Sequence, residues 1–199
     1  MRYPKLRELK EAIKALIKGP YTSKFPFKPH TPPKTFRGKP KYDQDKCVGC
    51  GACFEVCPAE AITLEDIVTE GKAVRKLTHY ADICIFCGQC QAACITKEGI
   101  VLSQDYDLAV FERKDAQHSV EKDLVLCQSC QAVVGCRDHI KWVSDKLGVL
   151  SYSNPTLFLS GLKNLFLAEE EATSLASGGR SDRLKITCAK CRRQIVFRS

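Results

Sequence analysis

Two stretches of the chain repeat one pattern of four cysteines, and this repeat constrains the fold more than any other feature. "CVGCGACFEVC" runs from Cys47 to Cys57 and "CIFCGQCQAAC" from Cys84 to Cys94, an offset of 37 positions. The first stretch is followed by Pro58, whereas the second is followed by Ile95. Such clustering is compatible with a zinc site, a disulfide framework or a redox cofactor.

Composition argues for metal binding and against a disulfide framework. The chain has 199 residues, 44% of them apolar, and its 13 cysteines are an odd number. Charges interrupt the N-terminal segment every few residues, so we expect no secretory signal. No apolar run approaches the roughly 18–20 residues of a membrane-spanning helix, so we expect no transmembrane segment. A thiol-rich chain without a secretory signal indicates a reducing compartment, where clustered cysteines bind metal more often than they form disulfides.

The repeated spacing is that of the bacterial ferredoxin run, in which three cysteines hold one [4Fe–4S] cluster and the fourth reaches the neighbouring cluster. Zinc sites instead favour paired C-x2-C knuckles separated by a longer loop. We therefore predict that cluster 1 is held by Cys47, Cys50, Cys53 and Cys94, and cluster 2 by Cys84, Cys87, Cys90 and Cys57. Proline after the fourth cysteine shapes the exit turn and supplies no ligand. We expect Ile95 to change local hydrogen bonding and the cluster potential, not to remove the cluster.

A second group of cysteines lies in the tail. Two C-x2-C pairs, Cys127 with Cys130 and Cys188 with Cys191, are separated by 57 residues. Together they predict a closed tetrahedral site with four thiolates and a structural role, most simply for Zn²⁺. A rubredoxin-like single iron has the same ligands and is the alternative. Cys136 and His139 receive no assignment.

The chain divides into three predicted regions of an α+β protein. Residues 1–41 combine an amphipathic helix, ended by Gly19-Pro20, with an extended arm rich in Pro and Phe. Residues 42–114 form a bacterial-type two-cluster ferredoxin domain: a hairpin turning at residues 70–71 joins the motifs, and a strand after the second motif can pair with "KYDQ" before the first. Residues 115–199 form a C-terminal helical domain with the Cys₄ zinc-type site and a Ser/Gly-rich loop at 173–182.

The formal charge of +8 would ordinarily suggest nucleic acid or an anionic membrane. Each [4Fe–4S] cluster with four thiolates carries about −2, as does Zn²⁺ with four thiolates. The charge of the loaded chain is therefore close to neutral, and we expect no nucleic-acid partner. The basic helix could also rest on a membrane surface, but the aromatic residues of the arm favour docking on a partner protein.

No phosphate-binding loop, nucleophile elbow or HExxH motif accompanies the cysteines. The sequence thus predicts an electron-transfer protein and not an enzyme. It predicts two [4Fe–4S] clusters and one Zn²⁺ as cofactors.

The residues around the motifs carry a family resemblance. "CIFCGQCQAAC" resembles the second cluster motif of the two-cluster ferredoxin-like subunit of respiratory complex I. "FRGKP" (residues 36–40) and "LSQDYDLAV" (residues 102–110) are similar to the equivalent subunit of complex-I-related membrane-bound [NiFe] hydrogenases. The cysteine-paired tail is similar to the formate hydrogenlyase branch of those hydrogenases. The resemblance is specific over residues 33–114 and rests only on cysteine pairs beyond residue 115.

That resemblance implies a subunit peripheral to the cell membrane on its cytoplasmic side. It would pass single electrons between an electron-input subunit and the [NiFe] hydrogenase small subunit. Its other partners would be the large subunit and the remaining peripheral-arm and membrane subunits. Three alternatives stay open: the same module in an NADH- or quinone-type complex I, a soluble ferredoxin, and a zinc-binding adaptor for nucleic acid.

Overall fold

The chain folds into two separate units. A computed structural model describes residues 5–19, 22, 24–164 and 185–197, and the contacts within it separate residues 1–36 from residues 37–199. The Ser/Gly-rich loop predicted at 173–182 lies outside the described residues. Among the described residues, no helix combines the length and apolar character needed to cross a membrane.

The first unit contains the predicted amphipathic helix, α1 (Leu6–Lys18). Its first turn is closed by the Lys5 backbone N–H, which donates to the Glu8 carboxylate at 3.0 Å, and the helix ends at Gly19 in a left-handed conformation. The apolar stripe is solvent-exposed, from 49% at Ile13 to 85% at Leu6. Residues 24–36 form turns and irregular backbone without helix or strand, as expected for a segment with this many prolines.

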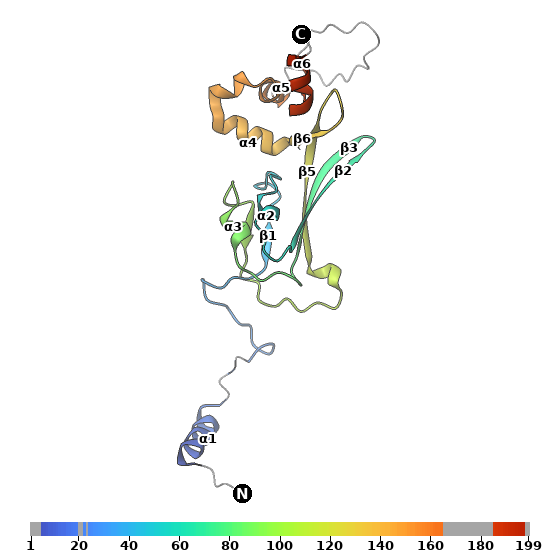
Figure 1. Ribbon diagram of the computed structural model, residues 1–199. Helices are drawn as coiled ribbons and strands as arrows, with labels where there is room; N and C mark the ends of the chain where they lie inside the picture. The colour runs from blue at the N-terminus through green and yellow to red at the C-terminus, as the bar shows by residue number, and fades with distance from the viewer. Residues whose placement is uncertain (1–4, 20–21, 23, 165–184, 198–199) are drawn as a thin grey trace. The chain divides into compact units, whose positions relative to one another are not determined.

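The second unit holds two antiparallel sheets (Figure 1). The two-stranded sheet pairs β1 (Pro40–Tyr42) with β4 (Ile100–Leu102), which confirms the predicted pairing across the two motifs. The larger sheet has the strand order β2-β3-β5-β6. Its strands are β2 (Ile62–Thr69), β3 (Lys72–Tyr80), β5 (Gln117–Leu126) and β6 (Val133–Cys136). The β2–β3 hairpin turns at residues 70–71, also as predicted.

In the second unit, each cysteine motif contains one short helix. The longer helices of this unit belong to the tail. In chain order, the short and long helices are α2 (Ala52–Glu55), α3 (Gln89–Ala92), α4 (Arg137–Leu147), α5 (Pro155–Asn164) and α6 (Ala189–Phe197). Short 3₁₀ turns cover Arg113–Ala116 and Gly148–Ser153. Helix α4 packs against α5 and against the β5–β6 end of the larger sheet (Figure 1).

Strand β5 was not predicted from the sequence. Its buried side chains are Val120, Lys122 and Leu124, on alternate positions of one face. A lysine in the inward row interrupts the apolar alternation that marks a strand. The sequence therefore shows no clear two-residue period over these positions. β5 pairs with β3 over seven residues, so the start of the tail and the cysteine-rich region share one sheet.

The core of this unit lies between the sheets and the two short helices. It joins apolar residues to cysteines of both motifs, and its buried members are Tyr42, Cys47, Cys53, Ile62, Leu77, Cys90, Ile100 and Val120. Burying thiols among aliphatic side chains removes them from water and places any group that they bind in a low-dielectric environment.

Candidate functional site

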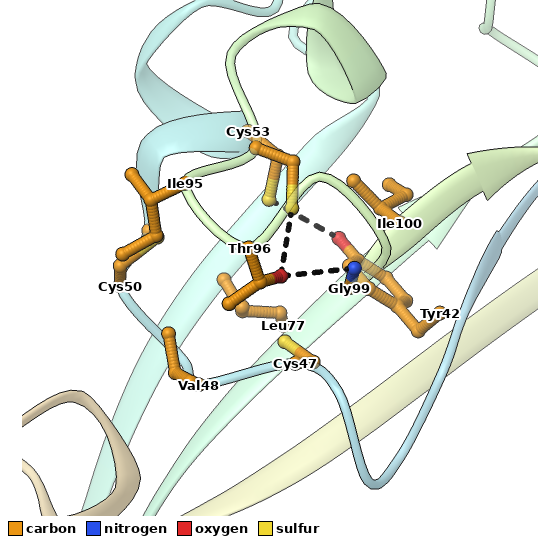
Figure 2. Close-up of a pocket in the computed structure, with 12 residues that line it drawn as sticks. Tyr42, Cys47, Val48, Cys50, Cys53, Leu77, Ile95, Thr96, Gly99 and Ile100 are labelled. Carbon is orange, nitrogen blue, oxygen red and sulfur yellow. Dashed lines mark hydrogen bonds between the residues drawn. The ribbon is translucent and has the colours of Figure 1, made fainter. Parts of the chain in front are cut away.

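The first cavity brings together four cysteines from both motifs. Cys47, Cys50 and Cys53 of the first motif line it (Figure 2), and Cys94 of the second motif is the fourth. The remaining lining is mostly apolar and consists of Tyr42, Val48, Gly51, Leu77, Ile95, Thr96, Gly99 and Ile100. The four thiols are those that the spacing predicts for cluster 1.

The second cavity mirrors the first. Cys84, Cys87 and Cys90 line it together with Cys57 from the other motif. The rest of its lining is Pro40, Pro58, Ala59, Ile62, Ile85, Phe86, Gly88, Gln89 and the imidazole of His79. Each cavity therefore takes three thiols from one motif and one from the other.

Matching glycines set the direction of the two motif helices. Gly51 and Gly88 precede α2 and α3, and both have φ of 82°, in the left-handed region. A Cβ on Gly51 would lie 2.9 Å from a methyl of Leu64, and one on Gly88 would lie 3.3 Å from a methyl of Leu102. A side chain at either position would add backbone strain and crowding, so glycine lets each loop turn close to the strand that follows its motif.

The exit turns after the fourth cysteines are alike although only one contains proline. The third residue after each cysteine has a left-handed φ, 51° at Glu60 and 64° at Lys97. After Cys94 the turn is held by the Lys97 N–H, which donates to the Cys94 carbonyl at 3.0 Å. It is also held by the Gly99 N–H, which donates to Thr96 Oγ1 at 3.0 Å. The Glu60 N–H makes the equivalent bond to the Cys57 carbonyl at 3.3 Å, so both turns share this bond and the Thr96 contact is the addition at Ile95.

Burial raises the pKa of four of these eight thiols, those of Cys47, Cys53, Cys84 and Cys90. Desolvation raises the pKa of Cys53 to about 12 and that of Cys90 to about 11. At Cys94 burial also raises the pKa, but hydrogen bonds from Thr96 and from the backbone of Gly99 and Ile100 outweigh it, so the net shift is downward. Metal ligands are thiolates, so loading either cavity releases protons.

The chemistry of both cavities fits iron–sulfur clusters. Four soft thiolates in an apolar setting are the ligand set of a [4Fe–4S] cluster. Backbone N–H groups point at cysteine sulfurs of the second cavity: Ala61 N–H donates to Cys57 Sγ at 3.2 Å, and Phe86 N–H to Cys84 Sγ at 3.4 Å. In the second cavity, both ring nitrogens of His79 are buried without a partner among the described residues, as expected where a sulfur acceptor belongs.

Three side chains from outside the first motif hold its loop at Gly49. Arg75 on β3 donates to the Gly49 carbonyl at 3.2 Å and forms a two-point ion pair with Asp66 at 2.7 and 2.8 Å. The thiol of Cys136, at the end of β6, donates to the same carbonyl at 3.2 Å. The stem of Lys122 on β5 packs beside Gly49. Cys136, which the sequence left unassigned, therefore joins the tail to the loop that carries Cys47 and Cys50.

Replacing Gly49 by alanine tests this contact. Gly49 has φ of +70°, and a Cβ there would lie 2.7 Å from Cys136 Sγ. We expect a loss of about 2–4 kcal/mol in the free energy of unfolding, from backbone strain and overpacking together. Gly71→Ala is the matched control, because Gly71 also has a left-handed φ but nothing within 4 Å of a Cβ, so about 1 kcal/mol is expected. Anaerobic chemical denaturation measures both, and equal losses would contradict a restrictive contact at Cys136.

The tail cysteines form a separate group. The sulfurs of Cys127, Cys130, Cys188 and Cys191 all lie within 4.8 Å of one another. Cys130 Sγ and Cys188 Sγ are 3.7 Å apart, close to the edge of about 3.8 Å expected for a tetrahedron of sulfurs 2.3 Å from a zinc ion.

Backbone contacts join the two knuckles. The Gln128 N–H donates to the Ile186 carbonyl at 2.9 Å, and the Ile186 N–H donates to Gln128 Oε1 at 2.8 Å. Burial alone would raise the pKa of Cys127, but backbone N–H groups of Cys188, Cys130 and Ser129 outweigh it and lower this pKa to about 6. The group is therefore suited to a divalent metal ion.

Comparison with known proteins places these sites in a family. Residues 46–98 match the family described as "4Fe-4S dicluster domain", so the chain carries an iron–sulfur dicluster domain over both motifs. The chain is 40% identical over 121 residues to formate hydrogenlyase subunit 6 of Escherichia coli (strain K12), a match covering 59% of this chain and 64% of that protein. It thus spans less than two thirds of the length of this relative.

One solved structure and a second relative are also similar to part of the chain. One solved structure, of the membrane-bound sulfane sulfur reductase, an archaeal respiratory membrane complex, aligns with a TM-score of 0.39 and 27% identity over 58% of this chain and 61% of that chain. NADH-quinone oxidoreductase subunit I 2 of Geobacter metallireducens is 33% identical over 123 residues, which cover 58% of this chain and 92% of that protein. Because this match extends over nearly the whole relative, the chain belongs to the family of NADH-quinone oxidoreductase subunit I proteins.

Proposed function

We propose that this chain is a non-catalytic electron-transfer subunit that relays single electrons through two [4Fe–4S] clusters within a complex-I-like membrane-associated complex. The observation that carries the proposal is the sharing of cysteines between the motifs. One cavity joins Cys94 to the thiols of the first motif, and the other joins Cys57 to those of the second. This is the arrangement of ligands in two-cluster ferredoxins.

The residues of the chain would hold each cluster in place and adjust its potential. Cys47, Cys50, Cys53 and Cys94 are the proposed ligands of cluster 1, and Cys84, Cys87, Cys90 and Cys57 those of cluster 2. The bound clusters supply reversible one-electron chemistry. The apolar lining keeps water from the sulfurs, and the N–H groups of Ala61 and Phe86 stabilise negative charge on the ligand thiolates.

For the tail we propose a structural Zn²⁺ held by Cys127, Cys130, Cys188 and Cys191. Support comes from the mutual distances of the four sulfurs and from the complete set of four protein ligands, which leaves no open position for substrate. The metal would hold the segment after residue 184 against the turn that follows β5. The paired hydrogen bonds of Gln128 and Ile186 join the same two segments.

We further propose a hydrogenase-type complex on the cytoplasmic side of the membrane. The chain would lie there between an electron-input subunit and the small subunit of a [NiFe] hydrogenase. The identity of 40% to a formate hydrogenlyase subunit supports this type. The exposed apolar stripe of α1 would dock against a neighbouring subunit. Membership of the subunit I family favours a second candidate, the equivalent position in an NADH- or quinone-linked complex.

One purification separates these candidates. The full chain, tagged and isolated anaerobically from membranes with its partners, should contain about eight cluster irons and one zinc per copy. Nickel in the same complex supports the hydrogenase type, whereas a flavin-containing NADH-oxidising partner without nickel supports the second candidate. A monomer that leaves the membrane fraction with both clusters intact would instead indicate a soluble ferredoxin. Zinc alone, without iron or visible charge-transfer absorption, would contradict the proposed function.

A further inference from the structure

His79 is a buried polar side chain that lies among the thiols of the second cavity. It belongs to β3, is 1% exposed and lines the cavity with Cys57, Cys84, Cys87 and Cys90. Both its ring nitrogens are buried, and neither has a hydrogen-bond partner in the part of the chain that the structure describes. Buried nitrogens without a partner are costly, because they lose their bonds to water without replacement.

The strands on both sides fix the position of this imidazole. His79 stands opposite Ile62 on β2 and opposite His118 on β5, so its strand is flanked on both sides. Burial, together with the charges of Lys39 and His118, lowers the pKa of His79 to about 4. Whether neutral or protonated, the ring carries at least one N–H donor.

The first cavity contains a comparable polar side chain close to a cysteine sulfur. Tyr42, which lines that cavity, is 8% exposed, and its hydroxyl lies 3.7 Å from Cys53 Sγ. The first cavity thus has a hydroxyl beside a ligand sulfur. The second has an imidazole whose partner is absent among the described residues. A cluster in that cavity would bring sulfur acceptors to the imidazole.

We propose that His79 donates a hydrogen bond from its imidazole N–H to a sulfur of the cluster in the second cavity and thereby raises the reduction potential of that cluster. The inference rests on the proposed function. Reduction adds one negative charge to the cluster, and a donor aimed at a sulfur stabilises that charge. His79 acts through this bond, supplies no ligand and takes up no electron.

The test is an EPR-monitored redox titration of the full chain with both clusters loaded. His79→Leu removes the donor with little change in size, and it should lower the midpoint potential of cluster 2 while that of cluster 1 stays unchanged. His79→Gln keeps an N–H donor near the same place and should restore part of the shift. His118→Asn is the matched control: its amide oxygen can still accept the Tyr42 N–H, now bound by His118 Nδ1 at 3.3 Å, and no shift in cluster 2 is expected.

Several outcomes would overturn the inference. These are unchanged potentials in His79→Leu, equal shifts in both clusters, and equal shifts in His79→Leu and His79→Gln. Loss of cluster 2 in the leucine and glutamine variants alike would also overturn it, because it would assign His79 a purely structural role. A wild-type chain that holds no [4Fe–4S] cluster would contradict the proposed function instead, and iron analysis before the titration distinguishes that failure.

Discussion

Replacing Cys57 by alanine is expected to remove the cluster of the other motif and to spare the one beside it in the sequence. Cys57 follows the first motif, but it lines the cavity of Cys84, Cys87 and Cys90. Without it that cavity keeps only three thiols, whereas the first cavity keeps all four. The iron content should fall from about eight to about four per chain, since each cluster requires four cysteine ligands.

EPR of the reduced variant measures this outcome, because one of the two cluster signals should vanish and the other should keep its shape. Cys136→Ser is the control, since Cys136 is a cysteine even more buried than the half-buried Cys57 but lines neither cavity. Its serine hydroxyl can still donate to the Gly49 carbonyl, so both signals should remain. If Cys57→Ala altered only the cluster of Cys47, Cys50 and Cys53, the exchange of cysteines between motifs would be wrong.

The second large effect is expected in the tail. Cys188→Ser removes one of four sulfurs that lie within 4.8 Å of one another, the one that lies 3.7 Å from Cys130 Sγ. A zinc site with three thiolates binds far more weakly, and its folding contribution is lost with the ion. The zinc content should drop from about one per chain to near zero, while the iron content stays unchanged.

Hydrogen exchange locates the consequence of that loss. Protection should fall at the Gln128 and Ile186 amides, whose hydrogen bonds join the two knuckles, and persist in the β2–β3 hairpin. Ser129→Ala serves as control, because it lies in the same turn and keeps its backbone N–H. Loss of both clusters in Cys188→Ser would show that the tail site is not an independent structural element.

The sequence predicts the elements whose signals are local. Cysteine spacing predicts two mixed sets of thiols, and the structure places those sets around two cavities; their role as ligands stays a prediction. The stripe from Leu6 to Ile17 predicts α1, and the turn at residues 70–71 predicts the β2–β3 hairpin. In each case neighbouring residues in the chain suffice to specify the structure.

The features that were missed depend on contacts distant in sequence. Strand β5 is hard to predict because Lys122 stands in its inward row. The ammonium of Lys122 is satisfied by distant groups, since it donates to the Gln44 carbonyl and, at 2.9 Å, to Asp138. Cys136 contacts Gly49 across 87 residues, and no spacing rule connects them. His79 resembles any other strand residue until the fold brings Cys57 and the second motif around it. A polar residue in the inward row of a strand is a weak signal that could have indicated both Lys122 and His79.

The pairing of β5 with β3 has a consequence for attempts to shorten the chain. β3 spans nine residues and lies between β2 and β5, so a chain cut at residue 114 would turn it into an open edge. That edge would present unpaired N–H and C=O groups beside Val74 and Leu77, which are buried in the full chain. Exposed edges of this kind recruit strands from other molecules. The tail thus shields the dicluster domain from self-association, and a minimal soluble version must retain residues 117–126.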